Sequence, residues 1–263
     1  MYEGKTLAKL RVGPSVEQRD GPPCIIVLHE VWGPDPNIDD ACKRLRKLGF
    51  ATAAPSLYEG YESVLSPRNV QKAMEAVWDL SLEDRRDKQK VAAEAAKKGS
   101  DGEARAALSV LYSQGFRDGM LEIVIKAVRR ARAAHGKVAT LGFSLGGGLS
   151  LASATRPGHP DAAVAYCGEP PGPHDLRGVS IPMLAIYASR DEIINPLVPA
   201  FVEAALKHGL DLTAQVLPDT RHDFFNMTKR GRYNREAAEK AWETTAWFLT
   251  RTLGWDPHPS YRQ

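Results

Sequence analysis

The chain of 263 residues carries 35 basic and 32 acidic side chains, for a formal net charge of +3. Its hydrophobic fraction is 43% and its charged fraction 25%, values typical of a folded globular protein. Charges of both signs are interleaved, so the sequence disfavours a nucleic-acid partner. The length suits one hydrophobic core, and we expect a single domain over residues 1–263.

The sequence also bears on membranes, metals and compartment. No segment approaches the roughly 18 consecutive apolar residues of a membrane span, and the first residues lack the apolar core of a signal peptide. The three cysteines, Cys24, Cys42 and Cys167, lack the short paired spacings of a zinc site or of a disulfide framework. We therefore expect a cytoplasmic protein with no metal, no disulfide and no membrane partner.

Short apolar runs alternate along the chain with segments of helical periodicity, a pattern typical of a parallel sheet covered by helices. The predicted strands are Thr6–Val12 (an edge strand), Cys24–Leu28, Phe50–Ala54, Lys137–Gly142, Ala162–Cys167, Met183–Tyr187 and Leu212–Leu217. The predicted helices are Ile38–Leu48, Arg68–Leu82, a stretch near Asp118–Ala134, Gly146–Ala154, Pro196–Lys207 and Arg235–Leu253. We therefore expect an α/β fold whose functional site lies at the carboxyl ends of the strands.

The segment at about residues 82–105 differs from the rest of the chain in composition. It is rich in charged residues, and most of its uncharged residues are Ala, Gly, Gln or Ser. Two interpretations are open: a solvated helix and turn, or a mobile cap over the site. In the helix before it, Val70, Met74, Val77, Trp78 and Leu82 repeat at helical spacing and are expected to face the core.

The strongest local motif is Gly142-Phe143-Ser144-Leu145-Gly146. It follows a predicted strand and precedes a predicted helix, the context of the nucleophile elbow of an α/β-hydrolase. Side chains at the glycine positions would collide with the neighbouring strand and helix, and the helix N-terminus favours negative charge developing at Ser144. A dinucleotide-binding loop and a plain structural turn are the alternative interpretations.

A nucleophilic serine needs a base, and the base needs an orienting acid; in this fold they follow in the order serine, acid, histidine. Asp191 lies just after a predicted strand, and His222 lies in a loop before the last helix. We therefore predict Ser144, Asp191 and His222 as the catalytic residues. Glu192 and Asp219 are rival candidates for the acid. A helix cap at Asp191 and a surface-loop histidine at His222 are the non-catalytic alternatives.

The segment HEVWG, residues 29–33, follows the first well-defined strand. A backbone N–H group of this loop, paired with that of Leu145, is expected to form an oxyanion hole. Glu30 is less expected beside a nucleophile, because its carboxylate adds negative charge there. A buried hydrogen-bonding brace for the loop is an equally open interpretation of Glu30.

Six segments, in this order, resemble the dienelactone hydrolase family: HEVWG, PSLYEG, GKVATLGFSLGGGLS, VAYCG, ASRDEIINP and TRHDFF. The resemblance extends from about Gly21 to Leu253. It implies a compact α/β-hydrolase that uses no cofactor and acts on a small-molecule ester or lactone through an acyl-enzyme intermediate. It also implies that Glu30 lies beside the nucleophile and tunes its ionisation, and that the backbone N–H groups of Val31 and Leu145 form the oxyanion hole.

The sequence departs from the family pattern at the nucleophile, where dienelactone hydrolases typically have Cys and this chain has Ser144. A serine hydroxyl has no accessible ionised resting form, so it needs its base throughout. Two explanations stay open: the natural protein is a serine-type relative of this family, or Ser144 replaces a cysteine of the natural protein. Residues 82–105 also look like a helical insertion, and the N-terminal hairpin is shortened to one strand.

A further departure from the family pattern is Asn226, which stands where the family holds a substrate carboxylate with Arg. Asn donates hydrogen bonds but carries no charge, so neutral esters and lactones are expected to be cleaved at least as well as an anionic dienelactone. Arg85, Arg86 and Arg221 are the candidates that could supply the missing cation.

The predicted function is serine-dependent hydrolysis of carboxylic esters or lactones. Another serine acyl-transfer enzyme, such as an acyltransferase or a peptidase, is one alternative. A non-catalytic protein of the same fold that binds a small molecule or a partner is the other. The sequence predicts neither the natural substrate nor the oligomeric state.

Overall fold

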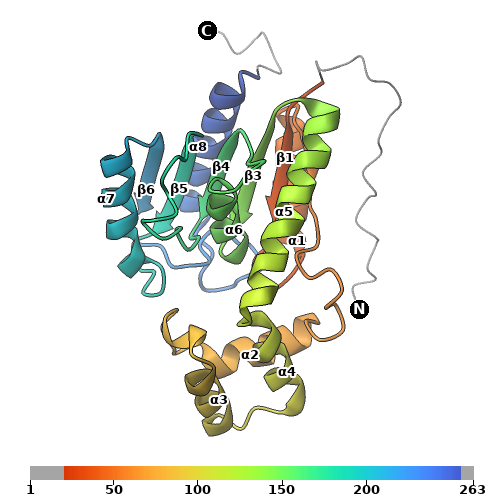
Figure 1. The fold of residues 1–263 in the computed structure, drawn as a ribbon, viewed down its shortest axis with the longest axis vertical. Coiled ribbons are helices and arrows are strands. Elements are labelled where there is room, and N and C mark those ends of the chain that lie inside the picture. Colours follow the sequence, from red (N-terminus) through yellow and green to blue (C-terminus); the bar gives the residue numbers. More distant parts are fainter. Residues whose placement is uncertain (1–20, 256–263) are drawn as a thin grey trace.

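The computed structural model describes residues 21–255, in which six parallel strands form one sheet (Figure 1). The strands are β1 Cys24–Leu28, β2 Ala51–Ala53, β3 Val138–Phe143, β4 Ala162–Tyr166, β5 Met183–Ala188 and β6 Leu212–Leu217. Each matches a predicted strand to within one residue at either end. The predicted edge strand Thr6–Val12 lies outside the described residues.

Helices cover both faces of this sheet. They are α1 Pro36–Lys47, α2 Pro67–Val77, α3 Lys88–Lys97, α4 Gly102–Leu111, α5 Gln114–His135, α6 Leu145–Ser153, α7 Val198–His208 and α8 Arg235–Leu253. Alternate side chains of each strand reach opposite faces: Ile25 of β1 packs in the core under α1 and α8, and Ile26 packs in the core under α5. No helix of the described part of the chain is long and apolar enough to cross a membrane.

The strand order β2-β1-β3-β4-β5-β6 places the functional loops at one point of the sheet. From β1 the chain moves to β2 on one side and then returns to β3 on the other side of β1. Open parallel sheets bind ligands where the strand order reverses in this way, beyond the carboxyl ends of the two strands. The loop after β1 contains Glu30 and the loop after β3 contains Ser144, so both lie at this switch point.

The helix predicted over Arg68–Leu82 is wrong at its C-terminal end, because α2 ends at Val77. The guanidinium of Arg85 donates to the backbone carbonyls of Trp78 (2.9 Å) and Leu80 (3.0 Å), so these carbonyls are satisfied without a further helical turn. Leu82 consequently leaves the apolar stripe of α2 and packs against a different part of the core.

The charged segment 82–105 forms a 3₁₀ helix at Asp84–Arg86, all of α3 and the first part of α4. We call α2, α3, α4 and the residues between them (67–111) the cap. Figure 1 shows these helices together beyond one end of the sheet, and α2 packs on both α3 and α4. Small buried side chains such as Ala73, Ala95 and Ala107 permit this close packing.

Candidate active site

Ser144 lies on a strained turn between β3 and α6, with φ 50° and ψ −112°. A non-glycine residue at positive φ costs on the order of 1–3 kcal/mol and persists only where the surroundings enforce it. A hydrogen bond holds Ser144 in this conformation, since its N–H donates to the Tyr166 carbonyl of β4 at 2.8 Å. This conformation is that of the predicted elbow.

Two glycines make the elbow sterically possible. A Cβ atom on Gly146 would lie 2.3 Å from the carbonyl oxygen of Leu28 in β1, and one on Gly142 would lie 2.0 Å from the carbonyl oxygen of Gly146. Both contacts are with backbone, which cannot turn away as a side chain can. The motif therefore needs glycine at both positions in order to bring α6 onto β1.

Three side chains from separate loops form one chain of hydrogen bonds. The Ser144 Oγ atom lies 2.7 Å from His222 Nε2, and His222 Nδ1 lies 2.6 Å from Asp191 Oδ2. Asp191 is buried, and 13% of the His222 side chain is exposed. Because Asp191 only accepts, His222 carries its proton on Nδ1 and presents Nε2 to the serine hydroxyl.

Asp191 is fixed at both carboxylate oxygens. Its Oδ1 atom accepts from the backbone N–H groups of Ile193 and Ile194, each at 3.1 Å, while Oδ2 contacts the imidazole. It therefore caps the following turn and orients His222 at the same time. The rival acids lie elsewhere: Glu192 is exposed, and exposed Asp219 forms an ion pair with Arg190.

The electrostatic surroundings set the pKa of His222. Burial alone would lower it, but the hydrogen bond and charge of Asp191, assisted by the carboxylate of Asp223, outweigh burial and raise the pKa above its ordinary value of about 6.5. The neutral form, which can accept a proton from Ser144, is therefore lost as pH falls through this raised pKa.

We accordingly expect kcat/KM to fall on the acid side with a midpoint above pH 6.5. Asp191→Asn removes the charge that raises this pKa, so the residual activity of that variant should show a midpoint at lower pH. A pH profile of kcat/KM for both proteins checks this. A midpoint at or below pH 6.5 in the wild type, unchanged in Asp191→Asn, would contradict the assignment of Asp191 as the partner of His222.

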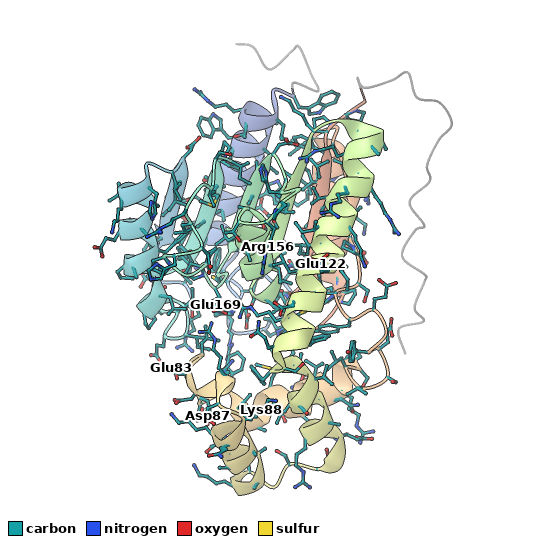
Figure 2. The ribbon with its side chains drawn as sticks, in the orientation of Figure 1. Glu83, Asp87, Lys88, Glu122, Arg156 and Glu169 are labelled. Atoms are coloured by element: carbon teal, nitrogen blue, oxygen red, sulfur yellow. The ribbon has the colours of Figure 1, made fainter. Side chains whose placement is uncertain are left out.

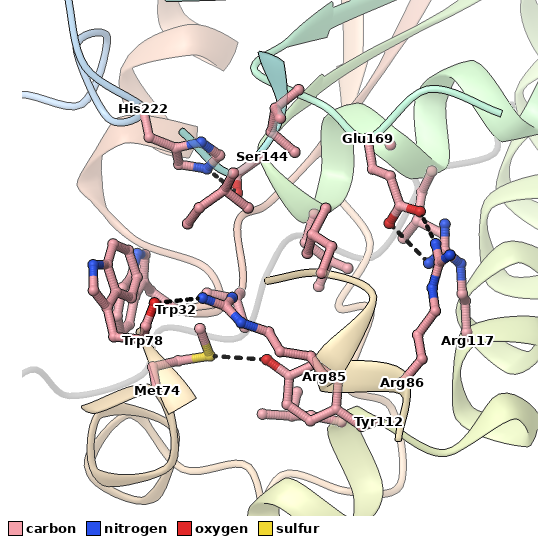
Figure 3. Close-up of a pocket in the computed structure, with 18 of the residues that line it drawn as sticks. Trp32, Met74, Trp78, Arg85, Arg86, Tyr112, Arg117, Ser144, Glu169 and His222 are labelled. Carbon is pink, nitrogen blue, oxygen red and sulfur yellow. Dashed lines mark hydrogen bonds and ion pairs between the residues drawn. The ribbon is translucent and has the colours of Figure 1, made fainter. Parts of the chain in front are cut away.

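The hydroxyl of Ser144 opens into a cavity of about 160 Å³ between the sheet and the cap (Figure 3). The cap contributes Met74 and Trp78, Tyr112 follows directly after the cap, and the loop after β1 contributes Trp32. These side chains make the cavity mostly apolar. Leu82, Arg85 and Arg86 of the charged segment also line it, so that segment covers the site.

The loop after β1 is held in place by two residues that sequence reasoning missed, His29 and Tyr58. The Leu57 N–H donates to His29 Nε2 at 3.0 Å, so Nδ1 carries the proton and donates to the Glu30 carbonyl at 2.6 Å. Burial lowers the pKa of His29 to about 4, which keeps the ring neutral. The Tyr58 hydroxyl donates to the Val31 carbonyl at 2.5 Å and fixes the following peptide.

Val31 and Leu145, the two predicted oxyanion donors, both line the cavity beside Ser144. Leu145 is the first residue of α6, so its backbone N–H is one of the groups that have no acceptor inside a helix. The arrangement can therefore present backbone donors to a negative charge that develops beside the serine.

Glu30 is buried behind this loop and is held by Asn226. The Asn226 side-chain amide donates to Glu30 Oε1 at 2.6 Å and to Asp35 Oδ2 at 2.9 Å. Burial, with the nearby carboxylates of Asp223 and Asp35, raises the pKa of Glu30 to about 8, although the Asn226 hydrogen bond opposes the shift. Glu30 is therefore mostly protonated at neutral pH.

Asn226 is fully buried and does not line the cavity, so position 226 cannot hold a substrate group here. Of the three arginines considered from the sequence, Arg85 and Arg86 line the cavity, whereas Arg221 is exposed elsewhere. Arg85 is buried, and its guanidinium forms no ion pair with a carboxylate of residues 21–255. No pattern in the sequence distinguished Arg85 from its neighbours.

Within residues 21–255, one cluster has metal-ligand chemistry: Cys167 Sγ, an Asp191 oxygen and a His222 nitrogen lie within 4.8 Å of one another. Burial raises the pKa of the Cys167 thiol well above its usual range, which disfavours the thiolate that a metal needs. Asp191 and His222 are already joined by a hydrogen bond of 2.6 Å that a metal would have to break. The geometry thus fits the hydrogen-bonded chain to Ser144 better than a metal centre.

Known proteins resemble this chain in sequence. A family model described as "Dienelactone hydrolase family" matches residues 12–253. A protein of Saccharolobus solfataricus named "Putative carboxymethylenebutenolidase" is 36% identical over 231 residues, which cover 86% of this chain and 88% of that protein.

Two solved structures have a similar fold. One is "Dienelactone Hydrolase-like Promiscuous Phospotriesterase P91 from Metagenomic Libraries", with a TM-score of 0.64 and 16% identity over 89% of this chain and 88% of that one. The other is "Putative Dienelactone Hydrolase from Klebsiella pneumoniae", with a TM-score of 0.61 and 23% identity over 89% of each chain. The predicted α/β-hydrolase fold is confirmed.

Proposed function

This chain belongs to the dienelactone hydrolase family, and from that premise we propose that it hydrolyses carboxylic esters or lactones through an acyl intermediate on Ser144. Membership of the family makes it a carboxylic ester hydrolase; the serine nucleophile and the acyl-enzyme are the proposal. One observation carries it, the hydrogen-bonded chain from Asp191 through His222 to Ser144, which opens into the cavity.

In the first half-reaction, the Ser144 Oγ atom attacks the substrate carbonyl carbon while His222 Nε2 takes the hydroxyl proton. Asp191 holds the imidazole in the tautomer that can accept this proton and stabilises the resulting cation. When the carbon–oxygen bond breaks, His222 returns the proton to the leaving alkoxide. In a lactone the leaving alcohol stays attached to the acyl group.

In the second half-reaction, water attacks the acyl-enzyme and His222 accepts a proton from it. Collapse of the tetrahedral intermediate returns that proton to Ser144 and releases the acid. The backbone N–H groups of Val31 and Leu145 stabilise the oxyanion in both halves, a contribution of about 3–4 kcal/mol for one such donor in other enzymes. His29 supports the first donor, because its Nδ1 hydrogen bond holds the Glu30 carbonyl, which belongs to the same peptide group as the Val31 N–H.

Glu30 acts in this proposal as a neutral positioning residue, because its raised pKa keeps it mostly protonated at pH 7. Glu30→Gln mimics the protonated carboxyl, so we expect kcat/KM at pH 7 to stay within about tenfold of the wild type. Glu30→Ala, which also removes the hydrogen bond to Asn226, is the comparison variant. A loss in Glu30→Gln as complete as that in Ser144→Ala would show that the carboxylate takes part in the chemistry.

Arg85 changes the expectation for substrate charge that followed from Asn226. A buried guanidinium without a carboxylate partner favours an anionic group nearby, and in the cavity that group is a substrate carboxylate. We therefore expect Arg85→Met to lower kcat/KM for a carboxylate-bearing lactone by at least tenfold more than for a neutral lactone. Equal losses on both lactones would assign Arg85 a structural role only.

The experiment that tests the proposed function is product analysis with a panel of short p-nitrophenyl esters and small lactones, with and without an alcohol acceptor. Release of free acid that depends on Ser144 supports hydrolysis. Transfer to the alcohol in preference to water would favour the acyltransferase alternative, and no turnover of any ester or lactone would favour a binding protein.

A further inference from the structure

The cavity that contains Ser144 is small. Its volume of about 160 Å³ is similar to that of an engineered protein cavity of about 150 Å³ that takes up benzene. It therefore suits a small lactone ring or a short acyl group. A second hollow of about 660 Å³ lies beside it, between α5, α6, α7 and the loop Glu169–Pro173 that follows β4. We call this second hollow the outer groove.

The same four residues line both hollows: Arg86, Arg117, Leu149 and Glu169. They therefore form the wall between the cavity and the outer groove. Three of them are charged and belong to different parts of the fold, since Arg86 lies in the cap, Arg117 in α5 and Glu169 after β4. Figure 2 shows Glu169 at the junction between the sheet and the cap helices.

The charged side chains of the wall are joined by ion pairs. Arg117 Nη1 donates to Glu169 Oε2 at 2.9 Å, and Arg86 donates to the other carboxylate oxygen. Figure 3 shows both guanidinium groups converging on Glu169, on the side of the cavity away from Trp32 and Trp78. A single carboxylate thus holds two cations together across the gap between the cap and the sheet.

The backbone of the wall is closely packed, whereas the side chains of its two arginines are exposed to solvent. The loop packs closely on α6, because a Cβ atom on Gly148 would lie 3.1 Å from the Glu169 carbonyl oxygen. The side chain of Glu169 is 18% exposed, but those of Arg117 and Arg86 are 42% and 62% exposed. Ion pairs with such exposure contribute little to stability. The wall is therefore a local barrier and not a support of the fold.

We propose that Glu169, held by Arg86 and Arg117, limits the length of substrate that Ser144 can use, by closing the cavity off from the outer groove. Truncating Glu169 removes the carboxylate, and the two guanidinium groups then repel each other and turn to solvent. A long acyl chain can then pass from the cavity into the groove. The turnover test of this inference rests on the proposed ester hydrolysis; the binding test does not.

The turnover test compares p-nitrophenyl acetate with p-nitrophenyl octanoate for the wild type, Glu169→Ala and Arg86→Ala. The octanoate-to-acetate ratio of kcat/KM should rise at least tenfold in both variants. Arg86→Ala alters a mostly exposed side chain and so protects the test against a folding defect in Glu169→Ala. Arg156→Ala is the matched control, because Arg156 lines the outer groove but not the cavity, and its ratio should stay within twofold of the wild type.

The binding test uses Ser144→Ala protein, with and without Glu169→Ala, and titrates benzamide and 4-butylbenzamide by calorimetry. Glu169→Ala should improve the Kd of the longer amide at least fivefold relative to that of benzamide. The inference would be overturned if the ratio of the two Kd values stays unchanged in Glu169→Ala. It would also be overturned if the octanoate-to-acetate ratio of kcat/KM rises equally in Arg156→Ala. If the wild type cleaves neither ester, the proposed hydrolysis fails while the binding test still decides whether Glu169 limits length.

Discussion

His222→Ala and Asp191→Asn are each expected to lower kcat by about two to four orders of magnitude while the protein stays folded. Without His222 nothing accepts the Ser144 proton across the 2.7 Å contact. With Asn at 191, the imidazole loses the negative charge that fixes its tautomer and stabilises its cation. Steady-state kinetics with p-nitrophenyl acetate, alongside circular dichroism and thermal melting, measure both effects.

The rival acids provide matched controls. Glu192→Gln and Asp219→Asn each remove a carboxylate that is close to Asp191 or His222 in the sequence, and both should retain kcat within about threefold of the wild type because neither side chain contacts His222. Asn also tolerates the positive φ of 55° at position 219. A loss below tenfold in Asp191→Asn, together with a large loss in either control, would move the acid to the other residue.

Gly146→Ala is expected to destabilise the protein strongly, because the added Cβ atom collides with the backbone of another element. The added Cβ would lie 2.3 Å from the Leu28 carbonyl oxygen and 2.6 Å from that of His29, so β1 and α6 would have to separate. We expect a free energy of unfolding lower by more than about 4 kcal/mol, or no soluble protein at all. Chemical denaturation followed by fluorescence measures it.

The matched control is Gly119→Ala in α5, where the added Cβ meets nothing within 4 Å. That substitution should stabilise the protein by about 0.5–1 kcal/mol through helix propensity alone. If the free energy of unfolding of Gly146→Ala is instead within about 1 kcal/mol of the wild-type value, and the variant keeps its activity, the steric explanation of the elbow is wrong.

The centre of the sheet could be predicted because β1, β3, β4 and β5 are short, buried and mostly apolar, a local property of sequence. The edge strands β2 and β6 are only partly buried. Leu28 and Phe143 both end such runs, and the polar residues that follow them lie at the switch point for purely topological reasons. Ser144 was recognisable because an elbow requires Gly142 and Gly146 beside it. The positions of Asp191 and His222 followed from chain order, and the structure brings both side chains to Ser144.

The rest depends on contacts between distant residues. The end of α2 at Val77 follows from Arg85, which reaches back to the carbonyls of Trp78 and Leu80. The family resemblance implies a substrate contact at position 226, yet the Asn226 side chain contacts Glu30 and Asp35 instead. Periodicity and motif spacing contain no information about such side-chain directions.

The position of the cap over the cavity also could not be predicted from local sequence. The charge of residues 82–105 was compatible with a solvated helix, and only the packing of α2 on α3 and α4 turns that segment over Ser144. Glu169 carried no signal in the sequence, because its partners Arg86 and Arg117 are far from it in the chain. Glu169, the central residue of the proposed length limit, is therefore one that sequence reasoning missed.

The most direct test of the central claim is intact-mass analysis after treatment with a small alkyl fluorophosphonate, which reacts with an activated serine. The account predicts one adduct on the wild type, mapped to Ser144 by peptide sequencing, and a parallel loss of ester hydrolysis. It also predicts no adduct on Ser144→Ala and much slower labelling of His222→Ala. An adduct that persists in Ser144→Ala, or full hydrolytic activity of that variant, would contradict Ser144 as the nucleophile.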